Sequence, residues 1–198
     1  MKTEDYTYTN RLLKKSLWKD FLDVQRPYRN HLRSLNLGNV LEIGCGIGRN
    51  LVNLGKRKGD VGVDHNISSV QECRSRGLTA FTSLDFISSA YAVKESFDTI
   101  LVAHVLEHLT VADASELLKS YIPYLKPNGT IMIITPQEAG FRSDPTHVTM
   151  MNPPLVKKIL TEFCGDKITQ YSFPLPMIFG HIFKYNENIS LGRKYGAD

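Results

Sequence analysis

Short apolar runs alternate along this chain with longer segments in which apolar residues recur every three or four positions. The short runs predict buried strands, whereas the longer segments predict amphipathic helices. The expected strands are 40–43, 61–63, 80–81, 97–103, 130–135, 167–173 and 181–191. The expected helices are 10–35, which is interrupted at Pro27, then 49–56, 68–76, 112–125 and 155–163.

This alternation predicts the α/β class. Strands that follow one another through helices, and that are apolar on both faces, form a doubly wound, mostly parallel sheet with helices on both sides. No helix is expected between the last two strands, 167–173 and 181–191. We therefore expect an antiparallel pair at one edge of the sheet. A chain of 198 residues is large enough for one domain with a substantial core.

Composition excludes few classes of protein. The chain is 42% hydrophobic and 22% charged, as is usual for a globular protein. Its net charge of +4 is too small to indicate nucleic-acid binding. The three cysteines form no CxxC pair, and their odd number favours a reducing, cytoplasmic setting. The start MKTEDYTYTN is polar, which argues against a signal peptide, and no run approaches the roughly 20 apolar residues of a membrane span.

The stretch VLEIGCGIGRNL at 40–51 places three glycines where the first strand should pass into a helix. Glycines at such a turn let a ligand approach the backbone. A dinucleotide fold would need G-x-G-x-x-G, but the sixth position here is Arg49. Glu42 precedes the glycines and suits a cationic group, while Asp64 ends the second strand and suits ribose hydroxyls. The pattern indicates a nucleoside with a positive centre and no diphosphate, properties that S-adenosylmethionine has.

Five segments in order resemble the motifs of class I S-adenosylmethionine-dependent methyltransferases. They are VLEIGCGIGR at 40–49, GVDHN at 62–66, LDF at 84–86, FDTILVAHVLEHL at 97–109 and LKPNGTIMIITP at 125–136. The resemblance covers residues 38–136, and the VLEHL type of motif resembles enzymes that mostly act on small molecules. It implies a Rossmann-like, seven-stranded sheet with an antiparallel edge strand and N-terminal helices. It also implies a helical extension or lid over 1–36, a cofactor-binding core over 37–136, and an acceptor loop with the last strands over 137–198.

The resemblance also assigns residues to the cofactor, S-adenosylmethionine, whose product is S-adenosylhomocysteine. Those expected around its methionine part and ribose are Glu42, Gly44, Cys45, Gly46 and Gly48, with Asp64, His65 and Asn66 at the ribose hydroxyls. Asp85 and Phe86 are expected at the adenine, and His104 and Val105 below the methionine chain. Arg29 and Arg49 compete for the cofactor carboxylate, although Arg49 also fits a plain helix surface, and Cys45 also fits a small filler. The N-terminal helices fit either a lid or simple packing on the sheet.

Methyl transfer is a direct displacement, and holding the two reactants in line supplies most of its acceleration. A general base is needed only where the acceptor must lose a proton. In a helical turn over 104–110, His104, Glu107 and His108 would share one face. We therefore expect His108 as a candidate base, because His104 is expected at the cofactor. The alternative is that the Glu107–His108 pair is structural.

The segment PQEAGFRSDPTHV at 136–148 follows the fifth strand, at the end of the sheet where ligands bind. Residues expected to bind the acceptor are Gln137, Glu138, Arg142, Asp144 and His147, with His147 also a catalytic candidate and His181 added from the apolar tail 173–188. Alternatively, Asp144 and Thr146 form a local turn within which His147 is bonded. Asp144 and Glu138 are conceivable ligands of a divalent ion, but the set is incomplete and no metal site is expected.

The expected activity is therefore transfer of the sulfonium methyl to an oxygen or nitrogen of a small-molecule acceptor, with no membrane partner. The alternatives are an RNA or protein methyltransferase and a non-catalytic cofactor-binding partner. The nucleobase tetrads NPPY and DPPY are absent, since AHVL stands there at 103–106, and no dense basic patch is seen. The sequence names neither the acceptor nor the oligomeric state.

Overall fold

The computed structural model describes residues 26–196. The chain divides into two compact units, residues 1–93 and 94–198. The part of the expected helix 10–35 that precedes residue 26, and most of the expected 1–36 extension, lie outside the described residues. No helix in the described part is long and apolar enough to cross a membrane. The expectation of one domain stays a prediction.

The first unit carries three parallel strands in the order β3-β2-β1. Its elements are α2 (Arg26–Ser34), β1 (Val40–Ile43), α3 (Arg49–Leu54), β2 (Val61–Asp64), α4 (Ile67–Ser75), β3 (Ala80–Thr82) and α5 (Ser83–Ile87). Leu41 pairs with Val61, and Gly62 pairs with Ala80. Every residue of β1 and β2 is buried, as expected for strands covered on both faces.

Short polar side chains and glycines set the helix boundaries in this unit. The Asn66 side chain accepts hydrogen bonds from the Ser68 and Ser69 amides and begins α4. Thr82 accepts from the Asp85 amide and begins α5. Gly55, in the left-handed region at φ 100°, ends α3. These local signals explain why the expected helices 49–56 and 68–76 agree with α3 and α4 within about two residues.

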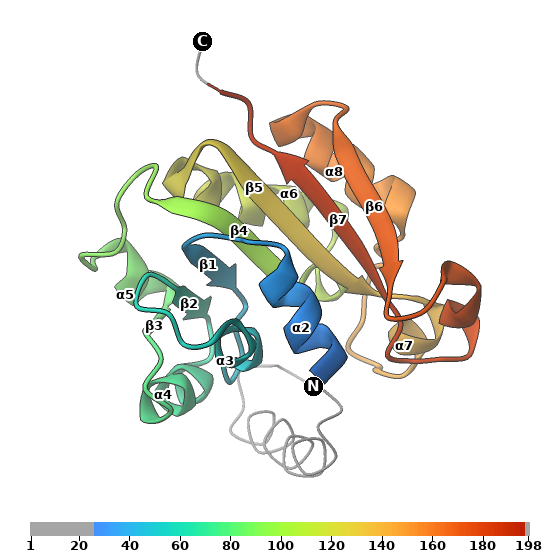
Figure 1. The fold of residues 1–198 in the computed structure, drawn as a ribbon, viewed down its shortest axis with the longest axis horizontal. Helices are drawn as coiled ribbons and strands as arrows, with labels where there is room; N and C mark the ends of the chain where they lie inside the picture. Colours follow the sequence, from blue (N-terminus) through green and yellow to red (C-terminus); the bar gives the residue numbers. More distant parts are fainter. Residues whose placement is uncertain (1–25, 197–198) are drawn as a thin grey trace. The chain divides into compact units, whose positions relative to one another are not determined.

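The second unit carries four strands in the order β4-β5-β7-β6. Its elements are β4 (Phe97–Ala103), η1 (Leu106–His108), α6 (Val111–Tyr121), η2 (Ile122–Tyr124), β5 (Leu125–Pro136), α7 (Glu138–Arg142), α8 (Pro153–Cys164), β6 (Ile168–Phe173), η3 (Met177–His181) and β7 (Glu187–Arg193). Strands β4 and β5 are parallel, whereas β7 is antiparallel to both of its neighbours. Helix α8 packs against β7 and β6 (Figure 1).

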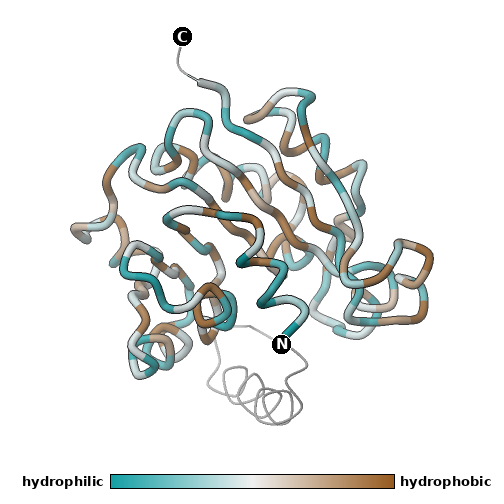
Figure 2. The backbone as a smooth tube through the Cα atoms, viewed as in Figure 1, coloured by the Kyte–Doolittle hydropathy of each residue, from teal (hydrophilic) through white to brown (hydrophobic). Residues whose placement is uncertain are grey.

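Strand β5 lies between β4 and β7 in the sheet of the second unit. Its residues 131–136 are all buried, and the middle of the strand is hydrophobic in Figure 2. The PNG sequence at 127–129 is typical of a turn, but it lies within β5. The pairing with β4 shifts from Phe97↔Leu125 to Thr99↔Thr130, so residues 126–129 interrupt the regular ladder. Asn128 takes φ 59°, the left-handed conformation that an asparagine tolerates.

The expected fold class is confirmed: the seven strands belong to a mostly parallel, Rossmann-like mixed sheet whose last two strands pair antiparallel. Two boundaries were wrong in the C-terminal part. The expected strand 181–191 begins only at Glu187, because η3 (Met177–His181) and local turn bonds such as Asn186 N–H to the Phe183 carbonyl precede it. The segment 136–148 was expected as a loop, yet it contains the short helix α7.

Candidate functional site

The loop between β1 and α3 turns through three glycines in the left-handed region. Gly44, Gly46 and Gly48 have φ of 70°, 53° and 76°. A Cβ at position 48 would lie 2.3 Å from Leu78 Cδ1 and 3.0 Å from Cys73 Sγ. Glycine at 48 is therefore required by the backbone and by packing within the first unit, before any ligand is considered.

Asp64 joins the end of β2 to this glycine loop. Its Oδ2 accepts a hydrogen bond from the Gly46 amide at 2.7 Å, and its Oδ1 accepts from the Asn66 amide at 2.8 Å. The exposed His65 ring approaches the same carboxylate, with Nδ1 3.6 Å from Oδ1. Asp64 thus fixes the loop conformation, a role that sequence reasoning did not assign to it. Its expected contact with ribose stays a prediction.

Glu42 is buried with one carboxylate oxygen satisfied and one not. Asn50 Nδ2 donates to Oε1 at 2.7 Å, whereas Oε2 accepts no hydrogen bond. Burial raises the pKa of the Glu42 carboxyl to about 8; the Asn50 hydrogen bond opposes this rise, and the charges of Asp64 and Asp60 add to it. An unsatisfied buried oxygen beside a glycine turn fits a ligand that brings a cationic hydrogen-bond donor.

The other residues expected at the cofactor differ in accessibility. Cys45 is buried with its Sγ 4.0 Å from Cys73 Sγ, which agrees with its alternative reading as a small filler. The Phe86 ring is fully buried near Phe81, so it belongs to the core. Asp85 is exposed on α5. Arg29, Arg49 and Val105 are all partly buried, on α2, on α3 and just after β4.

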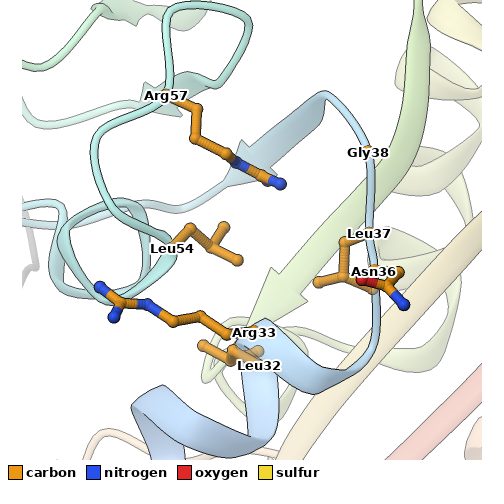
Figure 3. A pocket seen from close by; sticks show the side chains of 7 residues that line it. All are labelled: Leu32, Arg33, Asn36, Leu37, Gly38, Leu54 and Arg57. Atoms are coloured by element: carbon orange, nitrogen blue, oxygen red, sulfur yellow. The ribbon is translucent and has the colours of Figure 1, made fainter.

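A cavity of about 450 Å³ opens in the first unit between α2, the turn that follows it and α3 (Figure 3). Its lining residues are Leu32, Arg33, Asn36, Leu37, Gly38, Leu54 and Arg57. Both arginines have partners, since Arg33 Nε donates to the Asn53 carbonyl at 2.7 Å and Arg57 binds Asp60 through two nitrogens. None of the expected site residues lines this cavity, so we assign it no role in cofactor binding.

In the second unit, His104 follows β4 with φ 57° and bridges two carboxylates. Its Nε2 lies 2.8 Å from Glu187 Oε1, and its Nδ1 lies 3.3 Å from Glu107 Oε1. Withdrawal from water alone would lower the pKa of His104, but the two carboxylates outweigh it and raise the pKa to about 10. A pKa raised this far favours the imidazolium form at neutral pH, and an imidazolium has no lone pair with which to act as a base.

His108 and His147 come together from the segments after β4 and β5, with ring centroids 4.8 Å apart. His108 Nδ1 lies 3.1 Å from the Thr146 carbonyl, and His147 Nδ1 lies 2.7 Å from the Phe141 carbonyl. The Phe141 ring stacks on His147 at 5.3 Å. The structure thus unites both catalytic candidates, which stand far apart in the sequence.

Glu107 completes this group, and sequence reasoning did not assign it a function. Its side chain is fully buried, and atoms of Glu107, His108 and His147 that could bind a metal lie within 4.8 Å of one another. The adjacent pair Glu107–His108 was visible in the sequence, but its meeting with His147 depends on how the two segments fold together.

The acceptor candidates Asp144 and Glu138 form hydrogen bonds and ion pairs with other residues of the second unit. Asp144 Oδ1 accepts from the Thr146 amide at 3.1 Å and from its hydroxyl at 2.7 Å, which is the local turn considered as the alternative. Glu138 pairs with His181 and Arg142; the His181 hydrogen bond is the main reason that its pKa is lowered.

Gln137 is buried, and its amide joins the ends of three strands. Its Nε2 donates to Ser172 Oγ at 2.6 Å and to the Glu187 carbonyl at 3.1 Å, while its Oε1 accepts from Asn186 Nδ2 at 3.2 Å. The side chain thus stabilises the β5–β7–β6 junction. A contact with the acceptor stays a prediction for this residue.

Known proteins resemble this chain in fold more than in sequence. An S-adenosylmethionine-dependent methyltransferase from Archaeoglobus fulgidus has a TM-score of 0.65 at 20% identity, covering 88% of this chain and 99% of that one. A possible histamine N-methyltransferase from Thermotoga maritima has a TM-score of 0.65 at 17% identity, covering 94% and 98%. A Haloferax volcanii protein solved in complex with the Trm112 methyltransferase activator has a TM-score of 0.66 at 17% identity, covering 96% of each chain.

No curated protein matches the chain by sequence. A family model described as "Methyltransferase domain" matches residues 13–182, which is most of the chain. This match agrees with the glycine turn, the acid at the end of β2 and the mixed sheet. The chain therefore belongs to the methyltransferase-domain family.

Proposed function

We propose that this enzyme transfers the sulfonium methyl of S-adenosylmethionine to an oxygen or nitrogen of a small-molecule acceptor by in-line displacement. The observation that carries the proposal is the pair His108 and His147. Each Nδ1 contacts a backbone carbonyl, which only accepts, so in the neutral form of each ring the lone pair is on Nε2, where it can act on an acceptor's proton or bind an electrophile. A general base of this kind is needed where the hydroxyl or amine of the acceptor must lose a proton during methyl transfer.

The cofactor is assigned to the glycine turn of the first unit. Bound there, it supplies a methyl group on a positively charged leaving group. The unsatisfied Oε2 of Glu42 fits the cofactor's ammonium, and Asp64 fits its ribose hydroxyls. We propose the remaining contacts from the same resemblance: Gly44, Cys45, Gly46, Gly48, His65, Asn66, Asp85, Phe86, His104, Val105 and one of the two arginines, Arg29 or Arg49.

We assign the acceptor to the segment after β5 and to η3. Glu138 on α7 pairs with His181 at the end of η3, so these two elements lie together. Large apolar side chains are exposed nearby in the sequence at Leu175, Met177, Ile178, Phe179, Ile182 and Tyr185. A small acceptor with an apolar body and one polar reacting atom suits these surroundings, with contacts from Gln137, Glu138, Arg142, Asp144, His147 and His181.

Two of the compared proteins bear on the acceptor and on a protein partner. The Thermotoga maritima protein is described as a possible histamine N-methyltransferase. An enzyme of this fold that acts on a small amine supports the proposed small-molecule acceptor. The Haloferax volcanii protein was solved with an activator protein, so a protein partner is the second candidate to consider.

We propose a cytoplasmic location because Cys45, Cys73 and Cys164 are all free thiols.

The test is methyl transfer from S-adenosylmethionine labelled in its methyl group, using panels of phenols, alcohols and amines with an apolar body. Label should appear in at least one small acceptor, with an equal amount of S-adenosylhomocysteine formed. The His108→Ala variant should lose this transfer, and His31→Ala on α2 serves as a matched control. Label that enters only RNA or protein in a parallel reaction would overturn the proposed acceptor class.

A further inference from the structure

We propose that Glu107, His108 and His147 bind a divalent transition-metal ion. One carboxylate and two imidazoles provide ligand atoms that all lie within 4.8 Å of one another. Bonds of about 2.0–2.2 Å would bring ligand atoms to at most about 4.4 Å apart, so binding needs only a small inward movement of these side chains. His108 and His147 are half-buried, and Glu107 is fully buried.

The hydrogen bonds of both histidines prepare them for an ion. A carbonyl oxygen can only accept, so the contacts of His108 with Thr146 and of His147 with Phe141 require a proton on Nδ1. The lone pair of each neutral ring is then on Nε2. Histidines that bind metals usually donate their other N–H to a carbonyl or carboxylate, and this orients the ring and fixes its tautomer.

Glu107 supplies an independent indication of a missing ligand. Neither of its carboxylate oxygens accepts a hydrogen bond, although the side chain is fully buried. Oε1 forms an ion pair with His104, whose Nδ1 lies 3.3 Å away, whereas Oε2 has neither a hydrogen bond nor an ion pair among the described residues. A buried carboxylate with unused lone pairs is unfavourable, and a bound cation would satisfy them.

The two segments that carry these ligands are joined through their backbones. The Glu107 carbonyl accepts from the Val148 amide at 2.7 Å and from the Thr149 amide at 3.1 Å. Thr149 Oγ1 donates to the Leu109 carbonyl at 2.6 Å. These bonds hold His147 beside η1, so little conformational freedom would be lost when an ion binds.

The donor set selects the class of ion. Imidazole nitrogens suit zinc, iron, cobalt, nickel and copper, whereas magnesium and calcium prefer oxygen ligands throughout. Two histidines and one carboxylate leave coordination positions open. An acceptor oxygen or nitrogen bound there would lose its proton more readily. This role rests on the proposed methyl transfer; with both Nε2 atoms on the ion, neither imidazole would serve as the base.

Cobalt(II) is the probe for this site, because its visible absorption reports nitrogen and oxygen ligation directly. Metal-stripped full-length protein should bind one equivalent of cobalt(II) with new visible bands, and zinc(II) should displace it. His108→Ala and His147→Gln should each weaken cobalt binding by at least tenfold. The control His31→Ala should bind as the unaltered protein does. Thermal unfolding of every variant shows which of them keep the fold.

Glu107→Gln separates ligation from mere packing, because it retains the shape of the side chain but removes its charge. Weaker cobalt binding by a folded Glu107→Gln protein supports the site. If that variant does not fold, weaker cobalt binding by the two histidine variants tests the site instead. Failure of the unaltered protein to bind cobalt, or equal binding by the histidine variants, would overturn the site. These results do not depend on methyl transfer. Absence of transfer to every small acceptor would instead contradict the proposed function while cobalt binding remained.

Discussion

The carboxylate of Asp64 holds the Gly46 amide at a distance of 2.7 Å, so the end of β2 fixes the glycine turn that follows β1. Its other oxygen accepts from the Asn66 amide, which places the N-terminus of α4. One side chain therefore orders the two backbone segments to which we assign the cofactor.

Replacing Asp64 should weaken cofactor binding strongly. Asp64→Ala removes the anchor of the glycine turn together with the proposed ribose contact, and we expect at least a tenfold rise in the Kd of S-adenosylhomocysteine, about 1.4 kcal/mol or more. Isothermal titration calorimetry measures this. Asp98→Ala, which removes a surface carboxylate paired with Lys126 in the second unit, is the control. Unchanged affinity in a folded Asp64→Ala protein would refute the ribose assignment.

Glu42 should make the stability of the protein fall with pH. Its pKa is raised to about 8 in the folded state, against an ordinary value of 4.5. The folded protein keeps the proton that the unfolded chain releases, so stability is greatest below pH 4.5 and is lost as pH rises toward 8. We expect Glu42→Gln to remove part of this slope, on the order of 1 kcal/mol per pH unit. Urea unfolding between pH 5 and 8 checks it, and parallel slopes for the two proteins would contradict it.

Cofactor binding should also change the protonation of Glu42. A cationic donor at Oε2 favours the carboxylate, so binding of S-adenosylhomocysteine below pH 8 should release a proton. Calorimetric titrations in two buffers with different ionisation enthalpies measure that proton. The Glu42→Gln protein should release less, and equal release from both proteins would remove Glu42 from the ammonium site.

Gly48 and Gly77 form a matched pair that separates crowding from backbone strain. They have almost the same φ, 76° and 75°, but a Cβ would meet Leu78 and Cys73 at position 48 and no atom within 4 Å at position 77. Gly77→Ala should cost roughly 1–2 kcal/mol from the left-handed backbone alone. Gly48→Ala should cost about 1–3 kcal/mol more, measured by denaturant unfolding. Equal losses would show that the glycine turn accommodates a side chain.

His147→Ala should lower turnover while leaving cofactor affinity nearly unchanged. The proposal assigns His147 to the acceptor, whereas its contacts in the structure are with Phe141 and His108. We expect a fall of about 10²–10⁴ in kcat/KM for the acceptor, the usual range for loss of a group that handles the proton. The Kd of S-adenosylhomocysteine is measured in the same protein. Loss of cofactor binding would move His147 out of the acceptor site.

The sequence predicts the central part of this fold because its signals there are local. The run at 40–43 is apolar at all but one position, and glycines with an acid at 64 follow at spacings that identify the turn. The proline and glycine at 127–129 also provided a local signal, that of a turn, but these residues lie within β5. The β4 ladder pairs Leu125 and Thr130 on either side of these residues, and that long-range pairing cannot be seen from the local sequence.

The candidate site was less predictable because it depends on contacts between distant residues. His108 and His147 were each recognisable as histidines beside strand ends, yet their ring contact requires the Thr146 and Glu107 backbone bonds between the two segments. The sequence placed Glu107 on one face with His104 and His108, with a structural role for the Glu107–His108 pair as the alternative, but it did not reveal the complete burial of Glu107.

The most direct test of the central claim is thermal unfolding with and without S-adenosylhomocysteine, with NAD as the control ligand. At about 100 times its Kd, a ligand that binds only the folded state adds about 2.7 kcal/mol of stability. For a protein of this size that should raise Tm by several degrees. We expect this rise with S-adenosylhomocysteine and none with NAD. No rise with S-adenosylhomocysteine, or the same rise with NAD, would contradict the account.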